Sequence, residues 1–285
     1  MGVNSESASE TVTERLSALV TRVRAPNPSP MTLEGTNSLI VRAPGTERVI
    51  VVDPGPHETE HLERLCEFGT VEIILLTHGH PDHSDGAQWL HEKTGAPVRA
   101  SHPHFVMDAP VLRDGELVRA AGCVMTVVAT PGHSSDSVCF FVPDDEPCDR
   151  SQRFGSVLTG DTILGRGSTV IDPTGTLNDY INSLGRIANL GNVLVIPGHG
   201  DPIIDARLAA GALLEHRIDR LVRIERYLRG VNRRPKVEPD LVTGIVEELY
   251  PGLDQAIAFA ARLSVIAQLE FLSRFPIPPR PAGHP

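Results

Sequence analysis

The chain contains 285 residues, 40% of them hydrophobic, so it is long enough to bury one large core or two smaller ones. It has no run of roughly 18 apolar residues, the length that a membrane-spanning helix requires, and its polar N-terminus has no signal-peptide pattern. Its formal net charge of -10 disfavours non-specific binding to phosphate backbones. The four cysteines form no Cys-x-x-Cys pair, which is typical of a reduced compartment. We therefore expect a cytoplasmic protein that does not associate with membranes.

Up to about residue 204 the hydrophobic pattern predicts strands that alternate with helices. Residues 1–27 are expected to form a flexible or loosely docked leader. Two short strands, 38–41 and 49–52, should pair through the turn that contains Pro44 and Gly45. Helices are expected at about 58–68, 84–94 and 177–190. A polar loop is expected at 143–153.

From about residue 205 the strand pattern stops and a helical pattern replaces it. A long helix is expected at 205–229, followed by shorter helices at about 239–249 and 254–273. The long helix should bury one apolar face, formed by Leu214, Ile218, Leu221 and Leu228. The tail, 276–285, has too many prolines for regular structure. The sequence thus predicts a helical segment at 205–275 that follows the mixed segment at 28–204.

Basic residues are concentrated in one run of this helical segment. They are Arg217, Arg220, Arg223, Arg226, Arg229, Arg233, Arg234 and Lys236. Because the arginines repeat every third residue, they spiral around the helix and form no single stripe. Asp219 and Glu225 are interspersed among them. We therefore expect a solvated, salt-bridged helix surface here, with a nucleic-acid-binding patch as the alternative.

Residues 78–83 place three histidines and one aspartate directly after a predicted buried strand at 71–76. A loop at the carboxyl edge of a sheet is where α/β proteins place their chemistry. Imidazole and carboxylate are common zinc ligands, and one tetrahedral ion cannot use all four groups and keep a position for substrate. Two neighbouring ions can, with His78 and His80 on one and Asp82 and His83 on the other. The alternative is a polar surface turn with chance histidines.

The same arrangement of a strand followed by a potential ligand occurs three more times. His133 follows the apolar run 124–129, Asp161 follows 156–159, and His199 follows 193–196. In each case Gly or Pro breaks the run immediately before the ligand. A lone histidine after a strand is more often a capped or solvated residue, so it is the repetition that predicts a shared metal site.

With these motifs the chain resembles the metallo-β-lactamase-fold hydrolases. The segments Met-Thr-Leu-Glu-Gly-Thr-Asn at 31–37, Val-Asp-Pro-Gly at 52–55 and Gly-Asp-Thr-Ile-Leu-Gly at 160–165 resemble the lactamase-beta-like endoribonucleases, with glyoxalase II as a neighbour. The resemblance spans about 28–275. It implies an α/β (α+β) fold, a four-layer αββα sandwich at 28–204, and a winged-helix-like domain at 205–275. The proline tail stands where a wing would be expected, so we expect this domain to act as a lid or a dimerisation element of a homodimer.

The resemblance also implies the metal ligands. His78, His80 and His133 would hold one zinc ion, Asp82, His83 and His199 the second, and Asp161 would bridge both, with Mn²⁺ or Fe²⁺ as alternative metals. A hydroxide that bridges the two ions would be the nucleophile, and Asp82 would orient it. Asp82 and Asp161 are therefore the expected catalytic residues. Three further residues are expected to support a ligand or to contact substrate, namely Asp53, Asn37 and Tyr180.

These expectations describe a metal-dependent hydrolase and leave its substrate open. A phosphodiesterase that cuts single-stranded RNA is the first hypothesis, because the resemblance to the endoribonucleases includes the appended helices. The acidic composition and the missing wing argue against it. The alternative is a thioesterase or acyl hydrolase of glyoxalase II type that acts on a small-molecule ester or thioester. The second alternative is a non-catalytic metal-binding protein.

Overall fold

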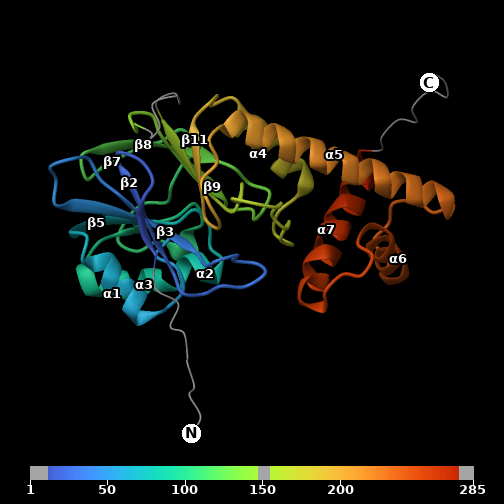
Figure 1. Cartoon of the computed structure of the whole chain (residues 1–285), viewed down its shortest axis with the longest axis horizontal. Helices are drawn as coiled ribbons and strands as arrows, with labels where there is room; N and C mark the ends of the chain where they lie inside the picture. Colours follow the sequence, from blue (N-terminus) through green and yellow to red (C-terminus); the bar gives the residue numbers. More distant parts are fainter. Residues whose placement is uncertain (1–11, 147–154, 276–285) are drawn as a thin grey trace, which may run out of the picture.

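The computed structural model describes residues 12–146 and 155–275, which form two stacked β-sheets with helices on both outer faces (Figure 1). This is the expected αββα sandwich. The first sheet has the strand order β1-β2-β3-β4-β5-β6 and the second the order β11-β10-β9-β8-β7. Strands β4, β5 and β6 run parallel, as do β10 and β11, and the other neighbours are antiparallel.

The strands are short, and their bounds are as follows. The first sheet contains β1 (Thr13–Arg15), β2 (Val20–Arg24), β3 (Asn37–Val41), β4 (Arg48–Val52), β5 (Thr70–Leu75) and β6 (Val98–Arg99). The second contains β7 (Leu117–Ala120), β8 (Cys123–Ala129), β9 (Val138–Val142), β10 (Ser156–Gly160) and β11 (Leu194–Pro197).

The helices agree closely with the sequence-based expectations. They are α1 (Thr59–Cys66), α2 (Pro81–Ser84), α3 (Gly86–Thr94), the 3₁₀ turn η1 (Pro103–Phe105), α4 (Leu177–Ala188), α5 (Ala206–Gly230), α6 (Pro239–Leu249) and α7 (Gln255–Arg274). Side-chain caps begin several of them. Thr176 accepts a hydrogen bond from the Asp179 amide at the start of α4, and Asp205 accepts one from the Leu208 amide at the start of α5.

Side chains that alternate in direction along the central strands produce the layers of the sandwich. In β4, Ile50 and Val52 enter the core between the two sheets, while Val49 and Val51 enter the core beneath α1 and α3. Successive side chains of a strand point to opposite faces, so a strand that is apolar throughout can fill two cores. The sandwich follows directly from these continuous runs of branched residues.

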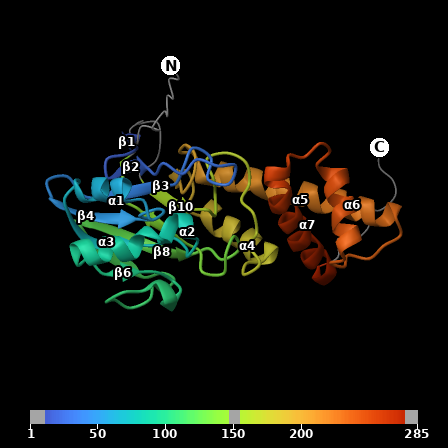
Figure 2. The ribbon, with the colours of Figure 1, turned by 90° about the horizontal axis from the view of Figure 1, so that it is seen from below.

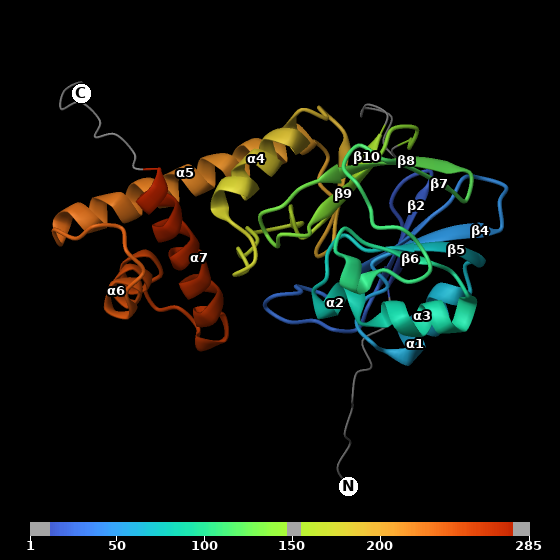
Figure 3. The ribbon, with the colours of Figure 1, turned by 180° about the vertical axis from the view of Figure 1, so that it is seen from behind.

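A third core joins the second sheet to the C-terminal helices. It continues from Val157 and Val195 in the sheet through Leu184 in α4 to Ile245 in α6 and Val265 in α7. The long helix α5 extends beyond the sandwich, and α6 and α7 pack on it (Figures 2 and 3). After β11 no strand occurs up to residue 275 in the described part of the chain.

One expectation was wrong. Residues 13–24 were placed in the flexible leader of residues 1–27, but they form β1 and β2, and β2 pairs with β3. Val20 and Val23 are fully buried. The short Val-Thr-Arg-Val-Arg run was overlooked because it carries two arginines, and Arg22 is buried through ion pairs with Glu14 and Asp201. Residues 1–11, most of the expected polar loop and the proline tail lie outside the described residues.

The apolar face of α5 also differs from its expectation. Ile218 is 49% exposed, whereas Leu221, Ile224 and Leu228 are buried. The buried face includes Arg217, which was expected on the solvated surface. None of the described helices is long and apolar enough to cross a lipid bilayer.

Gly132 is a position where the fold tolerates no side chain. Its φ is +145°, and an added Cβ would lie 2.3 Å from Tyr180 Cα. We expect Gly132→Ala to lower the free energy of unfolding by at least about 2 kcal/mol, because strain and overpacking add. Gly211→Ala, in open space within α5, should instead raise it by about 0.5–1 kcal/mol. Urea unfolding of the metal-free variants measures both, and equal effects would contradict this account.

Candidate metal centre

The seven predicted ligands come together at one edge of the sandwich. His78 and His80 follow β5, Asp82 and His83 lie in α2, and His133, Asp161 and His199 follow β8, β10 and β11. The ends of four strands therefore meet at this point, as the repeated sequence pattern predicted. Asp82 and His83 are held by a single helical turn that begins at Pro81, which favours a helix start.

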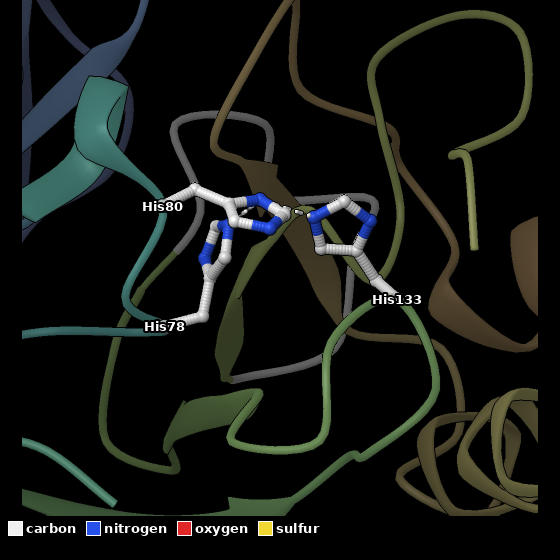
Figure 4. Close-up of side chains that lie close together, drawn as sticks. All are labelled: His78, His80 and His133. Atoms are coloured by element: carbon white, nitrogen blue, oxygen red, sulfur yellow. Dashed lines mark hydrogen bonds between the residues drawn. The ribbon is translucent and has the colours of Figure 1, made fainter. Parts of the chain in front are cut away.

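The first group consists of His78, His80 and His133, whose rings are turned toward one another (Figure 4). His80 Nδ1 lies 3.0 Å from His78 Nε2 and 3.0 Å from His133 Nε2. The ring planes are close to perpendicular, so the nitrogens converge and the rings do not stack. This arrangement suits a single cation between the three nitrogens.

The second group consists of Asp82, His83 and His199. His83 Nε2 lies 3.2 Å from His199 Nε2, and His199 Nε2 lies 3.2 Å from Asp82 Oδ2. Both histidines are almost completely buried. The group again offers two imidazole nitrogens and one carboxylate oxygen to a common point.

Asp161 lies between the two groups. Its Oδ1 is 3.2 Å from His83 Nε2 and 3.4 Å from His199 Nε2, while its Oδ2 is 3.7 Å from His133 Nε2. Its Oδ1 is buried and has no hydrogen-bond partner among the described residues. A buried carboxylate oxygen without a donor is costly, so its position favours a bound cation.

The outward-facing nitrogens of the histidines show that the cluster fits metal ions. His83 Nδ1 lies 2.8 Å from Asp53 Oδ2, His133 Nδ1 lies 2.7 Å from the Val170 carbonyl, and His199 Nδ1 lies 3.3 Å from the Gly35 carbonyl. A ring that donates a proton to these oxygens presents an unprotonated Nε2 to the cluster. Facing lone pairs repel each other unless a cation lies between them. The His and Asp groups can therefore bind metal ions.

Asp53 holds the loop that carries the first motif. Its Oδ1 accepts a hydrogen bond from the Thr77 amide at 2.8 Å, and its Oδ2 accepts one from the Thr77 hydroxyl at 2.7 Å, in addition to its contact with His83. Its backbone is left-handed, with φ of 51°. Asp53 is therefore both a turn residue and a partner of a histidine in the cluster.

Asn37 and Tyr180 lie behind the cluster. Asn37 Nδ2 donates to the carbonyls of Pro197 and Gly200, so it fixes the turn that contains His199. Tyr180 is fully buried and donates from its hydroxyl to the Thr162 carbonyl. Burial leaves Tyr180 no surface for contact with a substrate, and its position is that of a support for the loop after Asp161.

The charges within the cluster strongly affect one another. Burial, with the neighbouring His83 and His133, lowers the pKa of His78 well below its usual value. Burial opposes protonation of His83 and His199 as well, but the neighbouring carboxylates outweigh it, Asp161 and Asp53 at His83 and Asp161 and Asp82 at His199. They raise the pKa of His83 well above its usual value and that of His199 to about 9. The metal-free cluster thus retains protons that a metal would displace, so metal affinity should fall as the pH falls.

Two cavities open beside the cluster. One, of about 190 Å³, includes His133 and Asp161 in its lining, and its apolar wall consists of Pro30, Met31, Leu33, Leu164, Val170, Ile257 and Ala260. The other, of about 380 Å³, is lined by residues that include His80, His102, His104, Phe105 and Asp172. A larger surface hollow of about 470 Å³ lies near Arg15 and Arg42 and contains none of the clustered residues, so we assign no chemistry to it.

Several supporting residues were missed by the sequence analysis. The carbonyls of Gly35 and Val170 and the hydroxyls of Thr77 and Thr169 all contact cluster histidines. Backbone carbonyls have no residue signature, and threonines are common near strand ends. Only Thr77, directly next to the first motif, carried a signal that could have identified it.

We expect metal content to distinguish Asp161 from Asp53, two of the aspartates that lie next to His83. The parent protein should retain roughly two ions per chain. Asp161→Asn should retain at most about one, because only Asp161 reaches both groups, whereas Asp53→Asn should bind both ions about 10- to 100-fold more weakly. Elemental analysis and metal titration after dialysis measure this. Indistinguishable metal binding by the two variants would contradict a bridging role for Asp161.

The comparisons with known proteins agree with this geometry. Residues 31–199 match the model of the metallo-beta-lactamase superfamily. Among solved structures, a beta-lactamase domain protein from Burkholderia ambifaria superposes with a TM-score of 0.72 at 22% identity, covering 93% of this chain and 91% of that chain. A metallo-beta-lactamase family protein from Thermus thermophilus has a TM-score of 0.71 at 24% identity, covering 90% of this chain and 93% of its own.

Two curated relatives are more similar in sequence. A beta-lactamase-like protein 2 homolog from Caenorhabditis elegans is 30% identical over 229 residues, covering 76% of this chain and 73% of its own length. An atrochrysone carboxyl ACP thioesterase from Aspergillus fumigatus is 33% identical over 223 residues, covering 75% of this chain but only 64% of its own length. With the converging ligands, the family match and these relatives, the chain belongs to the metallo-beta-lactamase superfamily.

Proposed function

We propose that this metal-dependent hydrolase cleaves acyl thioesters whose acyl group is apolar, at a dinuclear centre held by the seven clustered residues. The observation that carries the proposal is the cavity of about 190 Å³ that reaches His133 and Asp161. Its lining is contributed by four segments that are far apart in the sequence. An apolar group bound there would place its carboxyl carbon beside the metal ligands.

The walls of this cavity suit an acyl group better than a nucleotide. Met31 and Leu33 come from the loop before β3, Leu164 and Val170 from the loop after β10, and Ile257 from α7. Burial of a methylene group in such surroundings is worth about 0.8 kcal/mol. A ribose phosphate would lose hydration against these apolar walls, where the one cationic side chain of the cavity lining, Arg166, already pairs with Glu34.

When bound, a pair of ions at this site would acidify a water molecule and polarise the scissile carbonyl. The residues of the chain would then do the rest. Asp82 is partly exposed, and its pKa is lowered because its contacts with His199 and His83 outweigh burial, so its carboxylate is ionised at neutral pH. Its free oxygen would accept a hydrogen bond from the attacking water and orient it.

Four of the eight basic residues in the run at 217–236 are buried or paired with carboxylates, which weakens their support for the RNA hypothesis. Arg217 is buried, Arg229 pairs with Glu225, and Arg233 pairs with Glu238 and Asp240. Neutralised arginines release few counterions on binding nucleic acid, and counterion release supplies most non-specific affinity. The similarity to a fungal thioesterase points the same way, although it spans less than two thirds of that protein.

A substrate panel tests the proposal. We expect the zinc-loaded protein to release free thiol from acyl thioesters in a chelator-sensitive reaction, with kcat/KM rising about three- to fourfold per added methylene until the cavity is full. Nitrocefin should be hydrolysed negligibly. Chelator-sensitive cleavage of an RNA oligomer at low salt, with thioesters left intact, would show that the order of the two hypotheses is wrong.

The cavity wall on α7 should set the acyl-length preference. Ala260→Phe would fill space beside Ile257, so kcat/KM for a long acyl thioester should fall at least about tenfold, equivalent to 1.4 kcal/mol, while an acetyl thioester is little affected. Phe259→Ala is the matched control, since Phe259 is 71% exposed on the same helix and does not line the cavity. Equal effects of Ala260→Phe on both substrates would exclude this cavity as the acyl site.

A further inference from the structure

Arg217 lies near the middle of α5, and only 2% of its surface is exposed. It is among the largest side chains that the core buries completely. A buried guanidinium is costly unless it is paired, yet no carboxylate pairs with it among the residues that the structure describes. Its Nε has no hydrogen-bond partner in the same set. Stability alone therefore does not account for an arginine at this position.

Arg217 makes two contacts, both to the part of the chain that supports the metal centre. Its Nη2 donates a hydrogen bond to the Thr169 carbonyl, and its guanidinium stacks over the Tyr180 ring at 4.9 Å from the centroid. Thr169 belongs to the segment between β10 and α4, which forms no helix or strand. Such a segment needs tertiary contacts to fix its position.

The other side of this segment contacts His133. Thr169 Oγ1 lies 2.8 Å from His133 Nδ1, and the Val170 carbonyl lies 2.7 Å from the same nitrogen. His133 Nε2 in turn faces His80 Nδ1 at 3.0 Å. Three successive contacts therefore lead from α5 to the first group of candidate metal ligands.

Tyr180 provides a second connection in the same place. Its hydroxyl donates to the Thr162 carbonyl, next to Asp161, and its backbone packs against Gly132, next to His133. The stacked pair of Arg217 and Tyr180 thus contacts the segment between β10 and α4 at two places, Thr162 and Thr169. A change in this pair would alter the direction of the His133 ring without touching a ligand.

We propose that Arg217 is a positioning residue through which α5 sets the orientation of His133 and hence the metal affinity of the group formed by His78, His80 and His133. The inference rests on the metal centre of the proposed function and does not depend on the substrate. It assigns the C-terminal helical segment a role in metal binding. The same segment also lines the proposed acyl cavity, through Ile257 and Ala260 of α7.

The test compares metal affinity with the stability of the metal-free protein. Arg217→Met keeps most of the side-chain volume and removes the hydrogen bond, so one of the two ions should bind about 10- to 100-fold more weakly. The midpoint of urea unfolding of the metal-free protein should not fall in proportion, because an apolar residue of similar volume often replaces a buried charge without loss. Arg217→Lys, which keeps a donor, should recover part of the affinity. Competition with a chromophoric chelator measures the affinity of the protein for each of the two ions.

The chain offers a matched control on the same helix. Arg220 stacks over the Tyr250 ring at 4.6 Å and donates to the Leu249 carbonyl at 3.4 Å, but its contacts lead to α6 and not to His133. Arg220→Met should therefore leave both metal affinities unchanged. Thr169→Val, which removes only the hydroxyl that contacts His133, should reproduce the selective loss even if Arg217→Met fails to fold.

Three outcomes would overturn the proposal. Parent-like affinity for both ions in Arg217→Met and Thr169→Val would remove its basis. Equal losses of metal affinity in the Arg217 and Arg220 variants would show that any change that loosens α5 weakens metal binding. A parent protein that binds no metal would overturn both this inference and the dinuclear centre. If the parent protein hydrolyses no thioester in the substrate panel while the Arg217 variants lose metal affinity selectively, the inference is supported and only the proposed substrate class is rejected.

Discussion

The rest of the structure depends on one electrostatic constraint, which is the convergence of five imidazoles and two carboxylates at a largely buried point. Facing histidine nitrogens repel unless a proton or a metal ion lies between them, and the buried Asp161 carboxylate lacks a hydrogen-bond donor at Oδ1 within the described residues. Cations at this point resolve both problems together. The protein therefore has to hold groups together that would otherwise move apart, and contacts on their outer side restrain His83, His133 and His199.

The sandwich provides these restraints because its strands end at the same edge. Asp53, at the end of β4, binds Thr77 and His83, and Asn37, at the start of β3, binds the turn of His199. Both strands pack in the continuous apolar cores on either side of the first sheet. The restraint on His133 differs, since it comes from a segment without regular structure that Tyr180 and Arg217 brace. The helices α4 and α5 thus extend the rigid scaffold to the side of the centre where no strand supports it.

Much of the site was predictable because the same local sequence pattern, an apolar run followed by a potential metal ligand, occurs four times. Four apolar runs, each followed within a few residues by a potential ligand and three of them broken by Gly or Pro before it, indicated the strands and the convergence of their ends. The helix α6 was expected at its observed bounds, since Pro239 and the apolar spacing mark it clearly. Strand β2 was not predictable in the same way, because Arg22 in its middle is buried by partners that are distant in sequence, such as Asp201.

The remaining features depend on tertiary contacts that no local pattern encodes. Arg217 belongs to a run of arginines with regular spacing, and only the packing of α4 against α5 distinguishes it from its exposed neighbours. The cavity beside His133 and Asp161 combines Met31, Leu164 and Ile257, which have no shared periodicity. Contacts to ligand histidines from carbonyls such as that of Val170 depend on backbone position and are independent of residue type.

Anomalous X-ray diffraction from crystals of the zinc-loaded protein, measured on both sides of the zinc absorption edge, tests the central claim most directly. The account predicts two anomalous peaks roughly 3.5–4 Å apart, one among His78, His80 and His133 and one among Asp82, His83 and His199, with Asp161 in contact with both. A single peak, or a peak outside these groups, would contradict it.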